Sequence, residues 1–195
     1  MRSTLWLVLL SLLAACPPAD RAAVRAEEAV DSARSREEAL AQFRTGLPEV
    51  TALDGGAESR DALFAAVVRG IETGDSTALA SLVLSRAEYA WLYYPTSAQG
   101  LPPYDLAPGL YWFMLEGRNR QGISFLLRER AGKPLRVVGY ECGPTVTTEG
   151  ANHLHGPCVI RRLQAPGDTV TERFFSQIIE RDGRFKVVAY YGDSD

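Results

Sequence analysis

The densest group of side chains able to bind a ligand lies between residues 89 and 112. Tyrosine and tryptophan combine an apolar ring with a polar tip, so they are favoured in pockets and at interfaces. The same side chains also fill protein cores, and both interpretations remain open for this stretch. The residues that we assign to a ligand-binding site are Trp91, Tyr93, Tyr94, Tyr111, Trp112 and Asp105.

Asp105 has two interpretations of its own. Enclosed beside a tyrosine, its carboxylate could act as a general acid or base. It also precedes Pro108, a residue suited to the first turn of a helix, so it could instead cap that helix. The first interpretation makes the chain an enzyme, and the second removes its main catalytic candidate.

The first sixteen residues have the order of an export signal. The positive charge of Arg2 precedes an apolar stretch at residues 5–13, which is too short to span a bilayer but suits a secretory signal. Residues 13–16 then read Leu-Ala-Ala-Cys. This resembles the lipobox of bacterial lipoproteins, in which the cysteine, here Cys16, is acylated and becomes the new N-terminus. The alternative is an ordinary signal peptide cleaved near Ala15.

The lipobox resemblance implies an exported chain whose partner is a membrane. Acyl chains on Cys16 would bind the bilayer with ~0.8 kcal/mol for each buried methylene. Pro17, and not an aspartate, follows the cysteine. In a cell with two membranes this resembles the pattern forwarded to the outer membrane, with the folded part facing the periplasm.

The remaining two cysteines, Cys142 and Cys158, form an even pair in a chain expected to be exported, which favours a disulfide. A zinc site is the alternative, because His153 and His155 lie between them. Neither cysteine belongs to a C-x-x-C pair, however, and the histidines fall in a loop predicted over residues 150–157. Further candidate ligands are Glu141 and Glu149, but no spacing singles either out. We therefore predict a disulfide and no metal.

Other classes of function find little support. The formal net charge of -3 argues against a nucleic-acid partner, which usually requires a basic excess. The chain contains no nucleophile elbow, phosphate-binding loop or zinc-peptidase motif. We expect no cofactor.

The chain divides into three parts. Residues 1–16 form the signal, and residues 17–57 predict a partly helical tether, rich in helix formers but with only a thin apolar stripe. Residues 58–195 are the predicted folded domain, and its first helix is capped by Ser59.

Helices are predicted in the first half of this domain. The first ends at Gly74, and Asp75 or Ser76 caps the second. Ser85 and Glu88 form a capping box for a short third helix, and Pro108 begins a long fourth one. Two glycines, Gly117 and Gly122, predict a weak or kinked middle of the fourth helix.

Strands are predicted in the second half. Apolar and β-prone runs indicate strands over residues 135–141, 159–163 and 170–180, and Asp182-Gly183 is a two-residue hairpin turn before the last strand. Helices followed by an antiparallel meander predict an α+β fold, with N-terminal helices packed on a curved four-stranded sheet.

Three features resemble nuclear-transport-factor-2-like domains: Gly74-Asp75 at the start of the second helix, the long later helix, and Ile-Glu-Arg-Asp-Gly-Arg-Phe-Lys-Val-Val at residues 179–188. The resemblance covers residues 59–192 and implies a cone in which a curved sheet wraps a long helix and encloses a pocket. Enzymes of this superfamily usually place an Asp, a His or an Asp–Arg pair in the pocket. No motif in this sequence identifies a residue that matches one of them. The scaffold hosts binding, assembly and hydrolytic functions alike.

The sequence therefore favours a non-catalytic lipoprotein that binds a small apolar or aromatic ligand or a protein partner, a second copy of the chain included. The alternative is a cofactor-free hydrolase or isomerase of the polyketide-cyclase-like type, in which Asp105 and a tyrosine form the acid/base pair.

Overall fold

The structure, a computed structural model, describes residues 35–165 and 167–191. The predicted export signal, Cys16 and the tether up to residue 34 lie outside these residues. From Arg36 onward the chain forms one compact unit. Within the described ranges, no helix is both long enough and apolar enough to cross a membrane.

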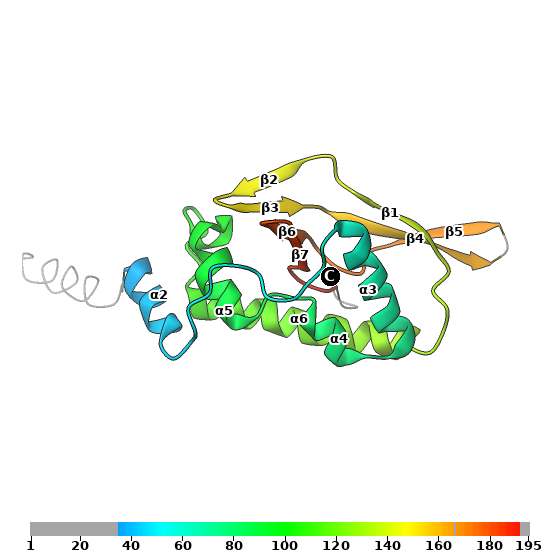
Figure 1. The fold of residues 1–195 in the computed structure, drawn as a ribbon, viewed down its shortest axis with the longest axis horizontal. Helices are drawn as coiled ribbons and strands as arrows, with labels where there is room; N and C mark the ends of the chain where they lie inside the picture. Colours follow the sequence, from blue (N-terminus) through cyan, green and yellow to red (C-terminus); the bar gives the residue numbers. More distant parts are fainter. Residues whose placement is uncertain (1–34, 166, 192–195) are drawn as a thin grey trace, which may run out of the picture. The chain divides into compact units, whose positions relative to one another are not determined.

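The helices precede the strands, as predicted for an α+β fold (Figure 1). Between α5 and α6 the chain makes a π-helical turn and two 3-10 turns, η1 to η3. The helical elements are α2 (Arg36–Arg44), α3 (Arg60–Thr73), α4 (Ser76–Ser81), α5 (Arg86–Glu88), η1 (Tyr89–Tyr93), η2 (Tyr94–Thr96), η3 (Ala98–Gly100) and α6 (Pro108–Arg130).

The helix caps follow from local sequence. The side chain of Ser59 accepts from the backbone N–H of Ala62 at the start of α3, and Asp75 caps α4 in the same way. Ser85 and Glu88 form the predicted capping box of α5. Asp105 does not cap α6, because the N-cap is Ala107, which makes no side-chain cap.

Helix α6 runs without a break through Gly117 and Gly122, the two glycines at which the sequence predicts a weak or kinked middle. Gly122 serves a different purpose. A Cβ at this position would lie 2.6 Å from the Cβ of Tyr190, so a larger residue would push α6 away from the segment that follows β7.

Seven strands in the described ranges form two antiparallel sheets, where the sequence predicts four strands in one sheet. One sheet has the order β1-β4-β5 and the other has the order β2-β3-β6-β7. The strands are β1 (Val137–Cys142), β2 (Val146–Glu149), β3 (Asn152–His155), β4 (Cys158–Ala165), β5 (Asp168–Glu172), β6 (Ile178–Arg181) and β7 (Arg184–Val187).

The two sheets are the two parts of one bent meander. β2 follows β1, and β3 leads into β4, after short breaks in the ladder, so these four strands make a long bent hairpin (Figure 1). The strand predicted over residues 170–180 is interrupted in the same way, between β5 and β6. The loop predicted over residues 150–157 contains β3. Its polar residues pair with strands on both sides, and Leu154 is buried opposite Ile179, which outweighs their weak strand propensity.

The predicted disulfide is confirmed. Cys142 and Cys158 are the last paired residues of the β1–β4 ladder, and their sulfur atoms are joined by a bond of 2.01 Å. The covalent link therefore lies where the long hairpin changes from one sheet to the other.

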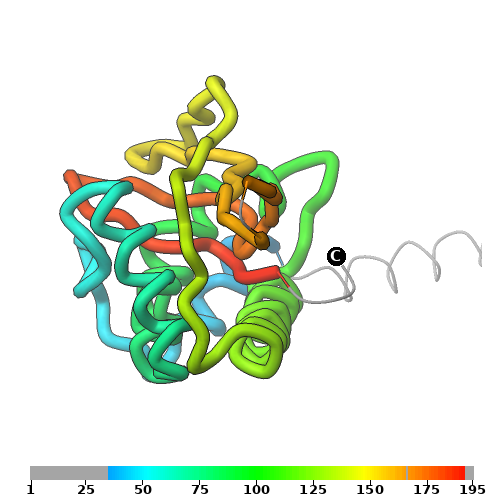
Figure 2. Tube along the Cα trace, turned by 90° about the vertical axis from the view of Figure 1, so that its right-hand side faces the viewer, coloured from blue at the N-terminus to red at the C-terminus, as the bar shows by residue number. Residues whose placement is uncertain are grey.

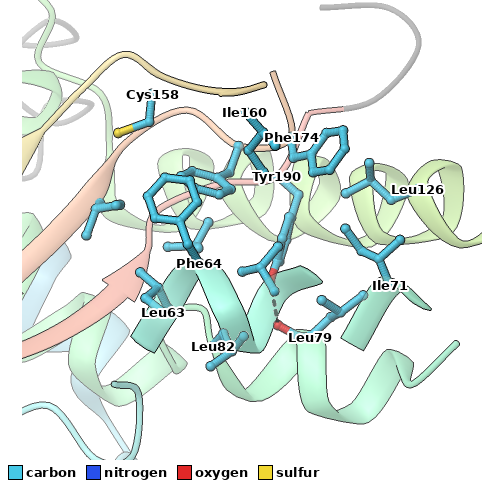
Figure 3. Close-up of a cluster of buried hydrophobic side chains, with 14 of the residues drawn as sticks. Leu63, Phe64, Ile71, Leu79, Leu82, Leu126, Cys158, Ile160, Phe174 and Tyr190 are labelled. Carbon is cyan, nitrogen blue, oxygen red and sulfur yellow. Dashed lines mark hydrogen bonds between the residues drawn. The ribbon is translucent and has the colours of Figure 1, made fainter. Parts of the chain in front are cut away.

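The buried side chains form two clusters on the two halves of α6, which Figure 2 shows along its axis. The first cluster joins α3 and α4 to the β1–β4 sheet and includes Leu63, Phe64, Ile160 and Tyr190 (Figure 3). The hydroxyl of Tyr190 donates to the carbonyl oxygen of Leu79 at 3.2 Å. The second cluster joins α2, η1 and the start of α6 to the other sheet.

The compact unit begins earlier than the predicted boundary at residue 58. Leu40 of α2, Leu53 and Ala57 are all buried, although the sequence places them in a tether. The guanidinium of Arg44 donates to the carbonyl oxygen of Ala90, and Phe43 packs edge-on against Tyr89. The few apolar residues of α2 are enough to hold it against the rest of the unit, because the hydrogen bonds of the Arg44 guanidinium add to their packing.

Candidate functional site

Most of the aromatic residues assigned to a ligand site pack against one another in the second core cluster. Tyr93, Tyr94 and Tyr111 are buried, and their hydroxyls already have partners. The Tyr93 and Tyr111 hydroxyls are 2.9 Å apart, and Tyr94 donates to the carbonyl oxygen of Leu106 at 2.8 Å. These three tyrosines contribute to the core, and their polar tips satisfy one another and the backbone.

Burial also keeps these hydroxyls protonated. It is the main cause that raises the pKa of Tyr93 and of Tyr111, with the neighbouring hydroxyl and the charge of Glu149 as further causes for Tyr93. Burial likewise raises the pKa of Tyr94. A tyrosine that holds its proton more tightly is a poorer general base at neutral pH.

Asp105 lies apart from any enclosed site. It is exposed and has a backbone φ of 45° in the loop before α6. An exposed carboxylate faces water, so Asp105 does not stand in the enclosed site that the acid/base interpretation requires. Trp91 is half-buried beneath the guanidinium of Arg44, which lies 3.9 Å from the ring centre.

The two histidines occupy β3 and make separate contacts. His153 is exposed, with Nδ1 3.3 Å from the Thr148 hydroxyl. His155 is buried, and its Nε2 lies 2.6 Å from a carboxylate oxygen of Glu180. No group of three or more metal-binding side chains gathers anywhere in the described ranges. Glu141 pairs instead with Arg161, and Glu149 accepts from the backbone N–H of Ala98.

Sequence reasoning missed a buried ion pair between α5 and β7. The Nζ of Lys186 lies 2.9 Å from both carboxylate oxygens of Glu88, and the two residues are 3% and 1% exposed. The same carboxylate accepts from the backbone N–H groups of Ser85 and Asp54. Because these four contacts satisfy the carboxylate, the pair is part of the framework and offers nothing to a ligand.

A groove of about 540 Å³ lies between α4 and α6. Its size falls in the range of small-molecule sites, and its lining is mainly apolar, as such sites require. Trp112, predicted as a ligand residue, forms part of it. The lining residues are Ser76, Thr77, Ala80, Val83, Leu84, Trp112, Glu116, Asn119, Arg120, Ile123 and Ser124.

Caps and side-chain anchors hold the two walls of this groove in place. Asp75 caps α4 through the backbone N–H of Ala78, at 2.8 Å. Asn119 of α6 accepts from the backbone N–H of Tyr190 and donates to the carbonyl oxygen of Val188. Because its amide is engaged on both sides, Asn119 fixes the rotation of α6 about its axis.

The two charged side chains of the groove lie on one edge of α6. Glu116 and Arg120 are exposed, stand one helical turn apart and make no ion pair with another residue of the described chain. An unpaired carboxylate and an unpaired guanidinium beside an apolar floor can orient a molecule that has an apolar body and a polar group. Only the spatial contact of α4 with α6 creates this arrangement, so periodicity alone could not reveal it.

Comparison with protein-family models, curated proteins and solved structures finds no significant match to this chain. Its functional interpretation therefore rests on its residues and their geometry.

Proposed function

We propose that the chain is a lipid-anchored binding protein that works outside the cytoplasm, and that the α4–α6 groove is its ligand site. The observation that carries the proposal is the groove itself, with its apolar floor beside the unpaired Glu116 and Arg120. The ligand is a small, largely apolar molecule with one polar group, and Trp112 supplies the aromatic wall.

Two further features support this function. The lipobox-like residues 13–16 support an anchor on Cys16. The Cys142–Cys158 disulfide supports a location in an oxidising compartment, such as the periplasm of a cell with two membranes.

The proposal extends to the fold family. Helices that precede an antiparallel meander, with the long α6 lying along the strands, support a nuclear-transport-factor-2-like domain. The ligand site then differs from the one that the resemblance implies, because the proposed groove lies between two helices and does not sit among the buried tyrosines.

A groove-filling variant tests the ligand site. Ala80 lines the groove and is exposed on α4, so Ala80→Phe fills the cavity without disturbing the core. The matched control is Ala41→Phe, an exposed alanine on α2 outside the groove. The probe is 8-anilinonaphthalene-1-sulfonate, an aromatic dye with one charged group, titrated into the chain from residue 17 onward.

We expect saturable fluorescence with the unchanged chain and with Ala41→Phe. Ala80→Phe should weaken binding at least tenfold, which corresponds to ~1.4 kcal/mol. Equal affinities for all three proteins would show that the dye, and with it the proposed class of ligand, does not use the groove.

A further inference from the structure

The outer face of α6 carries a row of exposed apolar side chains. Phe113 is 67% exposed, Leu110 51% and Met114 41%, and their spacing places them on one face of the helix. In the preceding loop, Tyr104 is 60% exposed and Leu101 39%. We call these five residues the outer stripe. Soluble monomeric proteins seldom expose large apolar side chains on one helix face, as Leu110, Phe113 and Met114 are here, without a binding role.

The outer stripe is distinct from the other two faces of α6. Tyr111, Leu115 and Leu126 face the core, and Trp112 and Glu116 face the groove. The position of Gly117, one turn beyond Phe113, has open space where a Cβ would stand. The stripe is therefore free in the described structure and needs a partner of its own.

The entry point of the chain indicates what that partner is. Arg36 begins the compact unit, and its guanidinium donates to the carbonyl oxygens of Pro95 at 2.7 Å and Tyr94 at 3.3 Å, where the loop toward Tyr104 begins. Phe43 of α2 is the nearest side chain to Gly109 at the start of α6. Figure 1 shows α2 beside this end of α6. The polypeptide that comes from Cys16 thus joins the unit next to the outer stripe.

This arrangement confines the stripe to the vicinity of the anchor. Residues 17–35 can span at most ~65 Å even when fully extended. A tether of that length keeps the local concentration of the stripe near the anchoring surface high, so weak docking is sufficient.

We propose that the outer stripe docks onto the phospholipid bilayer that holds the lipid on Cys16. This inference rests on the proposed lipid anchor. The Phe113, Leu110 and Met114 side chains enter the boundary between head groups and acyl chains, and Tyr104 places its ring there with its hydroxyl toward water. The exposed Arg118 and Arg120, on the flanks of the stripe, meet the lipid phosphates. Since Arg120 also lines the groove, docking places one edge of the ligand site at the lipid surface.

The test measures the depth of single spin labels on the full, lipid-modified chain in vesicles of phosphatidylethanolamine and phosphatidylglycerol. Met114→Cys carries the label in the stripe. Val138→Cys is the matched control, because Val138 is an apolar residue of β1 with an exposed fraction of 52%. With Cys16 acylated and Cys142 bound to Cys158, the introduced thiol is the only free one.

Power saturation with oxygen and with a water-soluble nickel complex should place the label at position 114 about 5–10 Å below the head groups, and the label at 138 in water. Adding Leu110→Ser and Phe113→Ser to the first variant should return its label to water. Flotation of the same samples reports the anchor independently.

Each other outcome contradicts the proposal in its own way. Vesicles that float with both labels in water would refute docking and leave the anchor intact. Spin–spin broadening at position 114 would show that a second copy covers the stripe, and would refute a lipid partner. A chain that does not float would refute the anchor and the docking together.

Discussion

At the scale of single residues, Glu88 shows how one side chain can serve both local and distant structure. Its carboxylate closes the capping box of α5 and neutralises Lys186 of β7, and it also accepts from the backbone N–H of Asp54. A buried carboxylate is tolerated only when it is paired in this way. The capping role is visible in the sequence, because Ser85 stands three residues earlier. The ion pair is not visible, because its partner lies on a strand far along the chain.

Removing the charge of Glu88 leaves Lys186 buried without a counter-ion. We expect Glu88→Gln to lower the free energy of unfolding by ~3–5 kcal/mol, measured by urea denaturation. The matched control is Glu129→Gln, which breaks the exposed pair between Arg128 and Glu129 and should change stability little.

A double variant separates the pair from the cap. Glu88→Gln combined with Lys186→Met removes both charges, so it should lose less stability than the sum of the two single variants. Strict additivity would mean that Glu88 acts through its backbone contacts alone.

At the scale of elements, the bent hairpin is the part of the fold that the sequence predicts least well. β1 and β4 contain valine and isoleucine and are recognisable, whereas β2 and β3 consist mainly of Thr, Glu, Asn and His. These polar strands are stabilised by pairing with each other and with β6, which local propensity does not describe. The caps at Ser59, Asp75 and Ser85 are predictable because each involves only the next three residues.

The disulfide at the bend closes a loop that contains both polar strands. Removing it should lower the free energy of unfolding by ~3 kcal/mol, since it restores the conformational freedom of about 15 residues in the unfolded chain. We expect the variant Cys142→Ser with Cys158→Ser to melt at a lower temperature and to be insensitive to dithiothreitol. The unchanged chain should melt lower once reductant is added. If all forms melted alike, the bond would make no contribution to stability.

At the scale of the whole molecule, the compact unit needs α2. The sequence suggests a tether up to residue 57 because the apolar positions of α2 are few. The structure buries Leu40 and Leu53 in the second core cluster and pairs Ala57 with Phe185 of β7. The groove could not be predicted from the sequence either, because its walls come from two helices that only the complete fold brings together.

Two truncated chains test this boundary. A chain of residues 58–195 loses the burial of both leucines, worth ~3 kcal/mol or more, relative to a chain of residues 36–195. We expect its melting temperature to be lower by roughly 6–12 °C, measured by circular dichroism. Leu40→Ala in the longer chain should reproduce part of the loss. If the two truncated chains melted together, the folded unit would begin where the sequence predicts.

The pairing of Glu88 with Lys186 also bears on when the protein can fold during its synthesis. The two residues are 98 positions apart, and the ribosome makes every helix of the described residues before β7. Until Lys186 emerges, Glu88 keeps its water and the helices lack the sheet that covers their apolar faces. The order of synthesis therefore means that the helices cannot be buried against β6 and β7 until these strands have been made.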